Sequence, residues 1–187
     1  MQIHQAIFHI KKVIPLEDCK KMIYYMDKHC KTKAEVMGRN NQPQTDTKTR
    51  DVLSHWLNPN DYEAPSYYKI VEDGIKEAMS KYSKHIKFLG RLHLHEVNLL
   101  KYEVGNFYIK HVDASSAMNR TISIIININE EYEGGDVVFF NPLNDQPYSK
   151  PDLKTGDMIL FPSNFLYPHQ VTPITKGLRY SIVTWLT

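Results

Sequence analysis

From residue 92 onward the chain is a series of short apolar segments separated by turn-forming residues. Groups that contain Gly or Pro recur at 105–106, 134–136, 141–142, 155–157, 161–163 and 176–177. The segments between them, such as the isoleucine-rich run 122–128, are long enough for one strand each and too short for a buried helix. This pattern is typical of an antiparallel sandwich or barrel.

The first half of the chain has a different, helical periodicity. A pattern of apolar residues spaced by three and four opens at Pro15 and runs to about Lys31, and a second one runs from about Ser66 to Tyr82. The apolar faces of these two predicted helices consist of Leu16, Cys19, Ile23 and Met26, and of Ile70, Val71, Ile75, Ala78, Met79 and Tyr82. A short alternation at Ile3–Ile10 predicts an edge strand.

These two halves predict an α+β chain that is mainly β. We expect one domain over 1–187, with helical support over about 1–90 and a β core over about 91–187. A jelly-roll barrel with the N-terminal helices buttressing one face accommodates both patterns.

Composition excludes several other classes of protein. The net charge is only +2, which does not predict a nucleic-acid or membrane surface. No apolar run approaches the roughly 20 residues that cross a bilayer, and the first residues do not form a secretory signal. Cys19 and Cys30 are the only cysteines and lack zinc-site spacing, so we expect idle thiols in a cytoplasmic protein. The oligomeric state stays open.

A histidine and an aspartate two residues apart form the first candidate site. His111 and Asp113 follow a strand-like segment, and residues two apart in a strand face the same way. Alone, this pair could also be a surface pair or a loop hydrogen bond. His169 lies near a later strand start, and two histidines with one carboxylate form the facial triad of non-haem iron(II) oxygenases.

Arg179 follows His169 by ten residues, inside the apolar segment 178–186. An arginine in such a segment needs a buried anion, either a protein carboxylate or a ligand. The far carboxylate of a 2-oxo acid bound at the metal is one such anion, because a guanidinium pairs with it through two hydrogen bonds. Ser181 lies on the same strand face and could reach the same carboxylate.

The ordered set of motifs from Tyr102 to Trp185 resembles the double-stranded β-helix core of prolyl 4-hydroxylase-type 2-oxoglutarate oxygenases. The matching pieces are Tyr102-x₂-Gly105-x₂-Tyr108-x₂-His111-x-Asp113, Arg120-Thr121, Glu133-Gly134-Gly135-Asp136-x₂-Phe139, Lys154-Thr155-Gly156-Asp157-x₂-Leu160-Phe161, His169-x₂-Thr172-Pro173, Gly177-x-Arg179 and Trp185. Each piece is common, but the ordered set is specific and covers about half of the chain.

The resemblance implies roles for individual residues. It implies that His111, Asp113 and His169 bind Fe(II), and that Arg179 and Tyr102 bind the carboxylate of 2-oxoglutarate. Further candidates for the oxoglutarate pocket are Ser181, Asn127 and Tyr108. Dioxygen is the second cosubstrate, with ascorbate as an optional reductant. The chain departs from the family at Asn127, where oxygen-sensing relatives carry an inward tyrosine, and at Asp136, where many relatives carry glutamate.

The resemblance further implies that the chain hydroxylates prolyl residues of a flexible peptide or protein, with release of succinate and CO₂. Alternatives are hydroxylation of another residue or a free small molecule, a non-catalytic β-barrel binding module, and a cupin-like metal enzyme without oxoglutarate. The polar segment 38–50, followed by Asp51, is either a substrate lid or a surface loop.

Four other features allow competing interpretations. Arg120 is either a substrate contact or a solvent-facing charge, and Trp185 either lines the substrate side or belongs to the core. His93 and His95 alternate in a strand, but no third ligand is evident for a second metal site. Gly134-Gly135 predicts a turn and not a phosphate loop, because no lysine and helix follow it.

Overall fold

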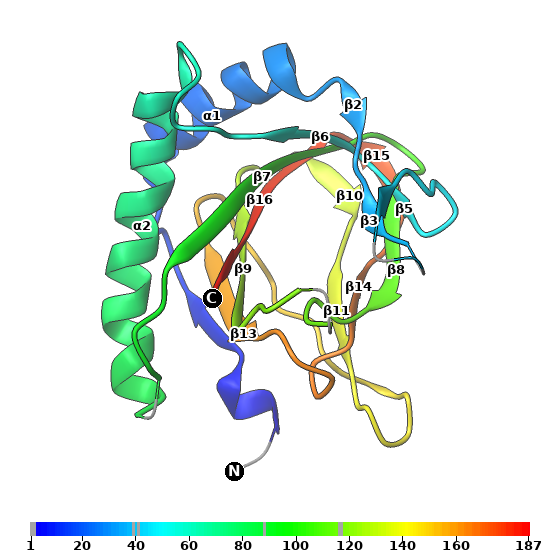
Figure 1. Ribbon diagram of the computed structural model, residues 1–187. Helices are drawn as coiled ribbons and strands as arrows, with labels where there is room; N and C mark the ends of the chain where they lie inside the picture. The colour runs from blue at the N-terminus through cyan, green and yellow to red at the C-terminus, as the bar shows by residue number, and fades with distance from the viewer. Residues whose placement is uncertain (1–2, 39, 41, 88, 116–117) are drawn as a thin grey trace.

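The computed structural model describes residues 3–38, 40, 42–87, 89–115 and 118–187. Two antiparallel sheets curve around a common interior, so that the strands form a ring in Figure 1. Every pairing among the described strands is antiparallel. This is the architecture that the alternation of short strands and turns predicts.

The larger sheet has seven strands in the order β1-β13-β9-β16-β7-β6-β2. Their bounds are β1 Phe8–Ile10, β2 Thr32–Lys33, β6 Leu53–Trp56, β7 Leu94–Tyr102, β9 Ile122–Asn127, β13 Met158–Pro162 and β16 Arg179–Leu186. Strand β9 is buried along its whole length because helices cover one of its faces and the barrel interior lies on the other. A strand buried on both faces is expected to be a continuous apolar run, as this isoleucine-rich segment is.

The smaller sheet has five strands in the order β12-β11-β14-β8-β5. Their bounds are β5 Arg50–Asp51, β8 Phe107–His111, β11 Val137–Phe140, β12 Pro147–Ser149 and β14 His169–Val171. Two further pairs of strands are β10 Tyr132–Gly134 with β15 Ile174–Gly177, and β3 Val36–Met37 with β4 Pro43–Gln44.

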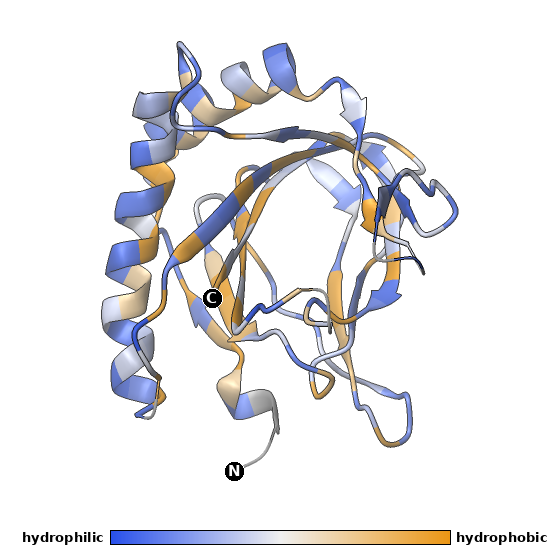
Figure 2. Cartoon of the chain, in the orientation of Figure 1, coloured by the Kyte–Doolittle hydropathy of each residue, from blue (hydrophilic) through white to orange (hydrophobic). Residues whose placement is uncertain are grey.

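Both predicted helices are present, as α1 Leu16–His29 and α2 Ala64–His85. They lie outside the ring of strands, and Figure 2 shows apolar residues on the side of α2 that faces the larger sheet. Side chains of both helices join those of β7, β9, β13 and β16 in the largest apolar cluster. Gly74 permits close packing there, since a Cβ at this position would lie 2.6 Å from Cδ1 of Ile14. That the helices buttress the barrel stays a prediction.

Several details differ from the expectations. The predicted edge strand at Ile3–Ile10 is a 3₁₀ turn, Ile3–Ala6, followed by the short β1 at the sheet edge. Leu16 is 58% exposed, because the helix buries the face of Cys19, Met22, Tyr25 and Met26 instead. The N-terminal half also adds β1, β2, β5 and β6 to the two sheets. Strands β1, β5 and β6 pair with β13, β8 and β7, which lie far away in the sequence.

Segment 38–50 contains β4 and the first residue of β5, while its residues 39 and 41 lie outside the described residues. Both cysteines are buried free thiols. Among the described residues, neither helix has the length and apolarity needed to cross a membrane.

Candidate metal centre

Three side chains from the smaller sheet and its adjoining turn converge on one point inside the barrel. His111 ends β8 and His169 begins β14, and these two residues are directly paired between neighbouring strands. Asp113 follows two residues after His111. One ligand atom from each of the three lies within 4.8 Å of the others. The structure therefore brings together the three residues that the sequence predicts as ligands.

The two histidines present the same ring nitrogen to the centre. Nδ1 of His111 lies 2.8 Å from the carbonyl oxygen of Ile109, and Nδ1 of His169 lies 3.1 Å from that of Tyr167. A carbonyl oxygen only accepts, so each Nδ1 carries the proton and each Nε2 offers a lone pair. These Nε2 atoms lie 3.5 and 3.7 Å from the two carboxylate oxygens of Asp113.

The carboxylate of Asp113 is oriented by a serine that the sequence analysis missed. The Ser123 hydroxyl donates to Oδ2 of Asp113 over 2.6 Å and lies 2.8 Å from the Ser163 hydroxyl. Strand alternation is the signal that could have identified it: in β9 residues 123, 125 and 127 face the barrel interior, and 124 and 126 face the helices.

Electrostatics prepares these side chains as ligands. Burial alone would raise the pKa of the Asp113 carboxyl, but nearby His169 and the hydrogen bond and charge of His111 lower it well below its ordinary range. Burial, and then the proximity of His111, lower the pKa of His169 to about 4. At neutral pH the site therefore offers a carboxylate and a neutral imidazole, the forms that bind metal.

This donor set fits iron(II). Two imidazole nitrogens and one carboxylate on one side of a metal leave the other coordination positions open, as in non-haem iron oxygenases. The cavity at the triad is walled by apolar and aromatic side chains, among them Leu100, Ile125, Val183 and Trp185. Such a wall limits the access of water to a metal bound there.

Tyr108 and Arg50 form another part of this wall. The Tyr108 ring stacks on the His111 ring with centroids 3.5 Å apart, and the Arg50 guanidinium lies 4.8 Å from the Tyr108 ring centroid. Burial raises the pKa of Tyr108 to about 12, so it is a neutral phenol. Within segment 38–51, Arg50 of strand β5 is the residue that lines the cavity. The role of the segment as a substrate lid stays a prediction.

Arg179 is the buried cation of the barrel, with 1% of its surface exposed. Its Nη1 donates to the Ser181 hydroxyl over 3.1 Å, its Nε has no partner, and no carboxylate of the described residues lies within ion-pair distance. The Tyr102 ring, which lines the metal cavity, lies 5.1 Å from the guanidinium carbon. An unpaired buried guanidinium is costly unless an anionic ligand reaches it. The alternative of a protein ion-pair partner finds no support among these residues.

Asn127 is fully buried on the strand beside Ser181, in direct register with it. Its amide is held by the Asn129 and Leu153 carbonyl oxygens and by the Tyr132 hydroxyl. Tyr132 is a second residue that sequence analysis missed.

The turn at Gly134-Gly135 serves packing. Both residues have positive φ, and a Cβ on Gly135 would lie 2.8 Å from Cδ of Arg179. Glycine therefore makes room for the buried arginine. Asp136 forms an ion pair of 3.0 Å with Lys150 at the surface.

Arg120 stacks on Trp185, a buried residue that lines the metal cavity, with its guanidinium carbon 3.4 Å from the ring centroid. Its Nη2 donates to Glu96 over 2.6 Å. Arg120 is thus held in place and does not extend into solvent. His93 and His95 are exposed, and neither belongs to the one metal-binding group found among the described residues.

Comparison with known proteins matches residues 97–187 to the family model for the 2OG-Fe(II) oxygenase superfamily. A PKHD-type hydroxylase of Aliarcobacter butzleri is 32% identical over 126 residues, covering 62% of this chain and 54% of that protein. A second PKHD-type hydroxylase, from Synechococcus sp. strain JA-2-3B'a(2-13), is 29% identical over 101 residues, covering 50% of this chain and 43% of that protein. The chain thus spans about half the length of the curated relatives it matches.

Solved structures with the same fold cover 97% of the chain. A prolyl-4-hydroxylase from Pseudomonas putida has a TM-score of 0.69 and 19% identity, with 91% of that chain covered. A Trichoplax adhaerens prolyl hydroxylase, solved with a hypoxia inducible factor peptide fragment, has a TM-score of 0.76 and 16% identity, with 83% covered. At these identities the likeness shows a shared jelly-roll fold. Residues 97–187, the segment that carries all three converging side chains, match the 2OG-Fe(II) oxygenase domain, whose cosubstrates are 2-oxoglutarate and dioxygen.

Proposed function

We propose that this chain is an Fe(II)- and 2-oxoglutarate-dependent hydroxylase that acts on prolyl residues in a flexible peptide or protein segment. The observation that carries the proposal is the converging triad of His111, Asp113 and His169 in one barrel with the unpaired guanidinium of Arg179. A metal and an anion are the two ligands that such a pair of sites would accept.

His111, Asp113 and His169 would hold the iron(II). Iron(II) held there, with 2-oxoglutarate and dioxygen, supplies an oxidation that puts one oxygen atom into a substrate C–H bond and the other into succinate, with release of CO₂. Ser123 and the two backbone carbonyl oxygens at Nδ1 of the histidines keep the three ligands oriented.

The other side chains of the barrel would bind and orient the 2-oxo acid. Arg179 would pair with its far carboxylate, and the Tyr102 hydroxyl, which has no hydrogen-bond partner among the described residues, would donate to the same group. Leu100, Ile125 and Val183 line the cavity and would exclude water around the bound acid.

The substrate would enter beside Trp185. This indole and the Arg120 guanidinium stacked on it form a flat, rigid surface, because Glu96 fixes the arginine. A prolyl ring is compact and apolar and can pack against such a surface. The similarity to proteins named PKHD-type hydroxylase and prolyl hydroxylase supports the same substrate class, prolyl residues.

The test is turnover with a panel of proline-containing peptides, Fe(II), 2-oxoglutarate and dioxygen. We expect one oxygen atom to be added to a prolyl residue, detected by mass spectrometry, with one succinate released per hydroxylation. Succinate release without any peptide product would contradict the prolyl substrate and favour a different residue or a free small molecule.

The matched controls are His111→Ala and His93→Ala. His111→Ala removes a ligand and should abolish succinate release, whereas His93→Ala changes an exposed histidine outside the barrel and should not. Equal activity of the two variants would reject the metal centre as the site of reaction.

A further inference from the structure

The polar groups of Asn127 are all engaged, although the residue adjoins the Arg179 anchor. Asn127 pairs in register with Ser181 on the neighbouring strand, and Ser181 accepts the hydrogen bond from the Arg179 guanidinium. An amide oxygen at this position is a potential acceptor for the same guanidinium. The hydrogen-bond partner of the Asn127 amide oxygen therefore affects how many N–H donors Arg179 keeps for a ligand.

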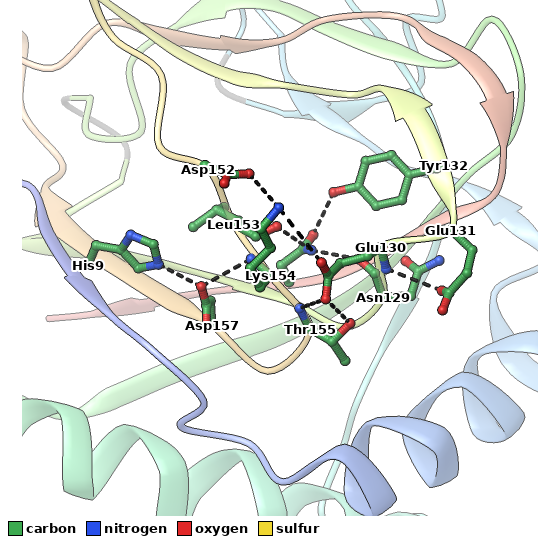
Figure 3. Close-up of polar contacts among 11 residues, drawn as sticks. His9, Asn129, Glu130, Glu131, Tyr132, Asp152, Leu153, Lys154, Thr155 and Asp157 are labelled. Atoms are coloured by element: carbon green, nitrogen blue, oxygen red, sulfur yellow. Dashed lines mark hydrogen bonds and ion pairs between the residues drawn. The ribbon is translucent and has the colours of Figure 1, made fainter.

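Three contacts fix the orientation of the Asn127 amide. Nδ2 donates to the carbonyl oxygen of Asn129 over 2.6 Å and to that of Leu153 over 3.3 Å. The Tyr132 hydroxyl donates to Oδ1 over 3.0 Å, a bond drawn from the Tyr132 ring in Figure 3. The amide oxygen is thereby turned to Tyr132, the one side-chain donor it meets among the described residues.

The backbone segment that carries the Leu153 carbonyl, which accepts a hydrogen bond from the Asn127 amide, is itself held in place. Figure 3 shows how the Asp157 carboxylate accepts the Lys154 backbone amide, and how Glu130 accepts the backbone amide and hydroxyl of Thr155 at 2.8 and 2.9 Å. These bonds fix the segment that carries the Leu153 carbonyl. The orientation of Asn127 is therefore imposed by a network outside the barrel interior.

The backbone around Arg179 is fixed from the same side. Asn129 donates through Nδ2 to the carbonyl oxygen of Leu178 and accepts through Oδ1 from the backbone amide of Tyr180, both over 2.8 Å. Both chain neighbours of Arg179 are thus held. The backbone position of Arg179 therefore does not depend on Tyr132. Only the choice of hydrogen-bond acceptors around its guanidinium depends on that residue.

The Tyr132 ring also faces the guanidinium. Its centroid lies 5.9 Å from the guanidinium carbon, and Tyr132 and Arg179 together line an outer cavity of about 360 Å³. Tyr102, on the metal side, lies at 5.1 Å. The arginine is therefore near one aromatic ring that lines the metal cavity and one that lines the outer cavity, and neither ring neutralises its charge.

From these contacts we infer that Tyr132 is a positioning residue for the carboxylate end of the 2-oxo acid site. Its hydroxyl occupies the Asn127 amide oxygen and so leaves the donors of Arg179 free for the carboxylate of the 2-oxo acid. The inference rests on the proposed function, because it takes Arg179 as the anchor for that acid. Tyr132 itself needs no contact with the metal or the substrate.

The test compares wild type with Tyr132→Phe, which keeps the ring and removes only the hydroxyl. Binding of 2-oxoglutarate is measured by calorimetry without dioxygen, with Mn(II) in place of iron. Removal of one hydrogen bond predicts a Kd for 2-oxoglutarate about three- to tenfold higher. The Kd for Mn(II) should be unchanged. In turnover, the KM for 2-oxoglutarate should rise while kcat at saturation is retained.

The matched control is Tyr148→Phe, which removes a buried hydroxyl that has no partner among the described residues. Its Kd for 2-oxoglutarate should equal that of wild type. Asn127→Leu provides a double-mutant cycle: with the amide oxygen gone, Tyr132→Phe should have no further effect on 2-oxoglutarate affinity.

The outcomes separate the inference from the proposed function. A wild-type protein that binds Mn(II) but no 2-oxoglutarate would refute the proposed function, and the inference with it. If wild type binds 2-oxoglutarate and Tyr132→Phe binds it equally well, only the inference is refuted. A parallel loss of Mn(II) and 2-oxoglutarate affinity would assign Tyr132 a merely structural role and would also refute it.

Discussion

Ser123 donates a hydrogen bond of 2.6 Å to Oδ2 of Asp113, the oxygen that lies 3.7 Å from Nε2 of His169. The two residues are ten positions apart in the sequence, one at the start of β9 and the other in the turn after β8. The larger sheet thus orients a ligand that belongs to the smaller sheet, so the metal centre depends on how the two sheets face each other.

Ser123→Ala should weaken metal binding without removing a ligand. Loss of an outer hydrogen-bond partner of a ligand costs roughly 10–100-fold in metal affinity. The Kd for Mn(II), measured by titration calorimetry, should rise by that factor. Ser163→Ala is the control, because Ser163 contacts Ser123 but makes no hydrogen bond to Asp113, and we expect a smaller effect. An unchanged Kd in Ser123→Ala would show that Asp113 is oriented without this bond.

Arg179→Lys and Arg179→Ala should both weaken 2-oxoglutarate binding and leave the metal ligands intact. Lysine retains the charge but loses the fork that pairs with a carboxylate, and alanine loses both. Charge-assisted bonds predict a KM for 2-oxoglutarate about 10–100-fold higher in Arg179→Ala, with a smaller rise in Arg179→Lys. Steady-state kinetics at varied 2-oxoglutarate would measure this. An unchanged KM in both variants would show that Arg179 does not anchor the oxo acid.

Removal of bound metal should lower the thermal stability. A metal that binds only the folded state at 100 times its Kd stabilises it by about 2.7 kcal/mol. For a chain of this size that predicts a Tm lower by about 5–11 °C after chelation. Thermal unfolding followed by circular dichroism, with and without Mn(II), would measure it. His111→Ala should show no response to metal, and a response equal to that of wild type would place the stabilising metal elsewhere.

Asp27 links α1 to the barrel and should make stability depend on pH. Its carboxylate accepts hydrogen bonds from Lys101 and from the Tyr180 hydroxyl, over 2.6 and 2.7 Å. Burial alone would raise the pKa of Asp27, but these two bonds lower it below its ordinary value. The stabilisation is therefore present at neutral pH and is lost as the pH falls through about 4 and below.

Asp27→Asn should accordingly reduce stability at pH 7 by about 0.2–1 kcal/mol, since the carboxylate is half-exposed and screened. Urea unfolding at pH 7 and in acid would show a smaller difference from wild type at the lower pH. The control is Asp73→Asn, which breaks an ion pair within α2 and no contact with the barrel. A difference from wild type that does not shrink in acid would contradict this account.

Much of the fold could be predicted from the sequence. The helix over 64–85 is present because its apolar residues recur at helical spacing and form one buried face. The strand over 122–127 is present because its continuous apolar run suits a strand that is buried on both faces. The edge strand predicted at the N-terminus is present in part as β1, but strands β5 and β6 could not be predicted in their places. Two to four residues carry too little periodicity, and their partners in β8 and β7 lie far along the chain.

For the site, the sequence by itself determined the candidates: His111, Asp113 and His169 as proposed ligands and Arg179 as proposed anchor are recognisable because their chemistry and order along the strands are local properties of the chain. Only the tertiary structure decided that Ser123 donates to Asp113, that Arg179 has no carboxylate partner among the described residues, and that the Tyr132 hydroxyl donates to the Asn127 amide oxygen. A side chain selects a hydrogen-bond partner by distance and direction once the sheets close around the interior, and sequence separation encodes neither.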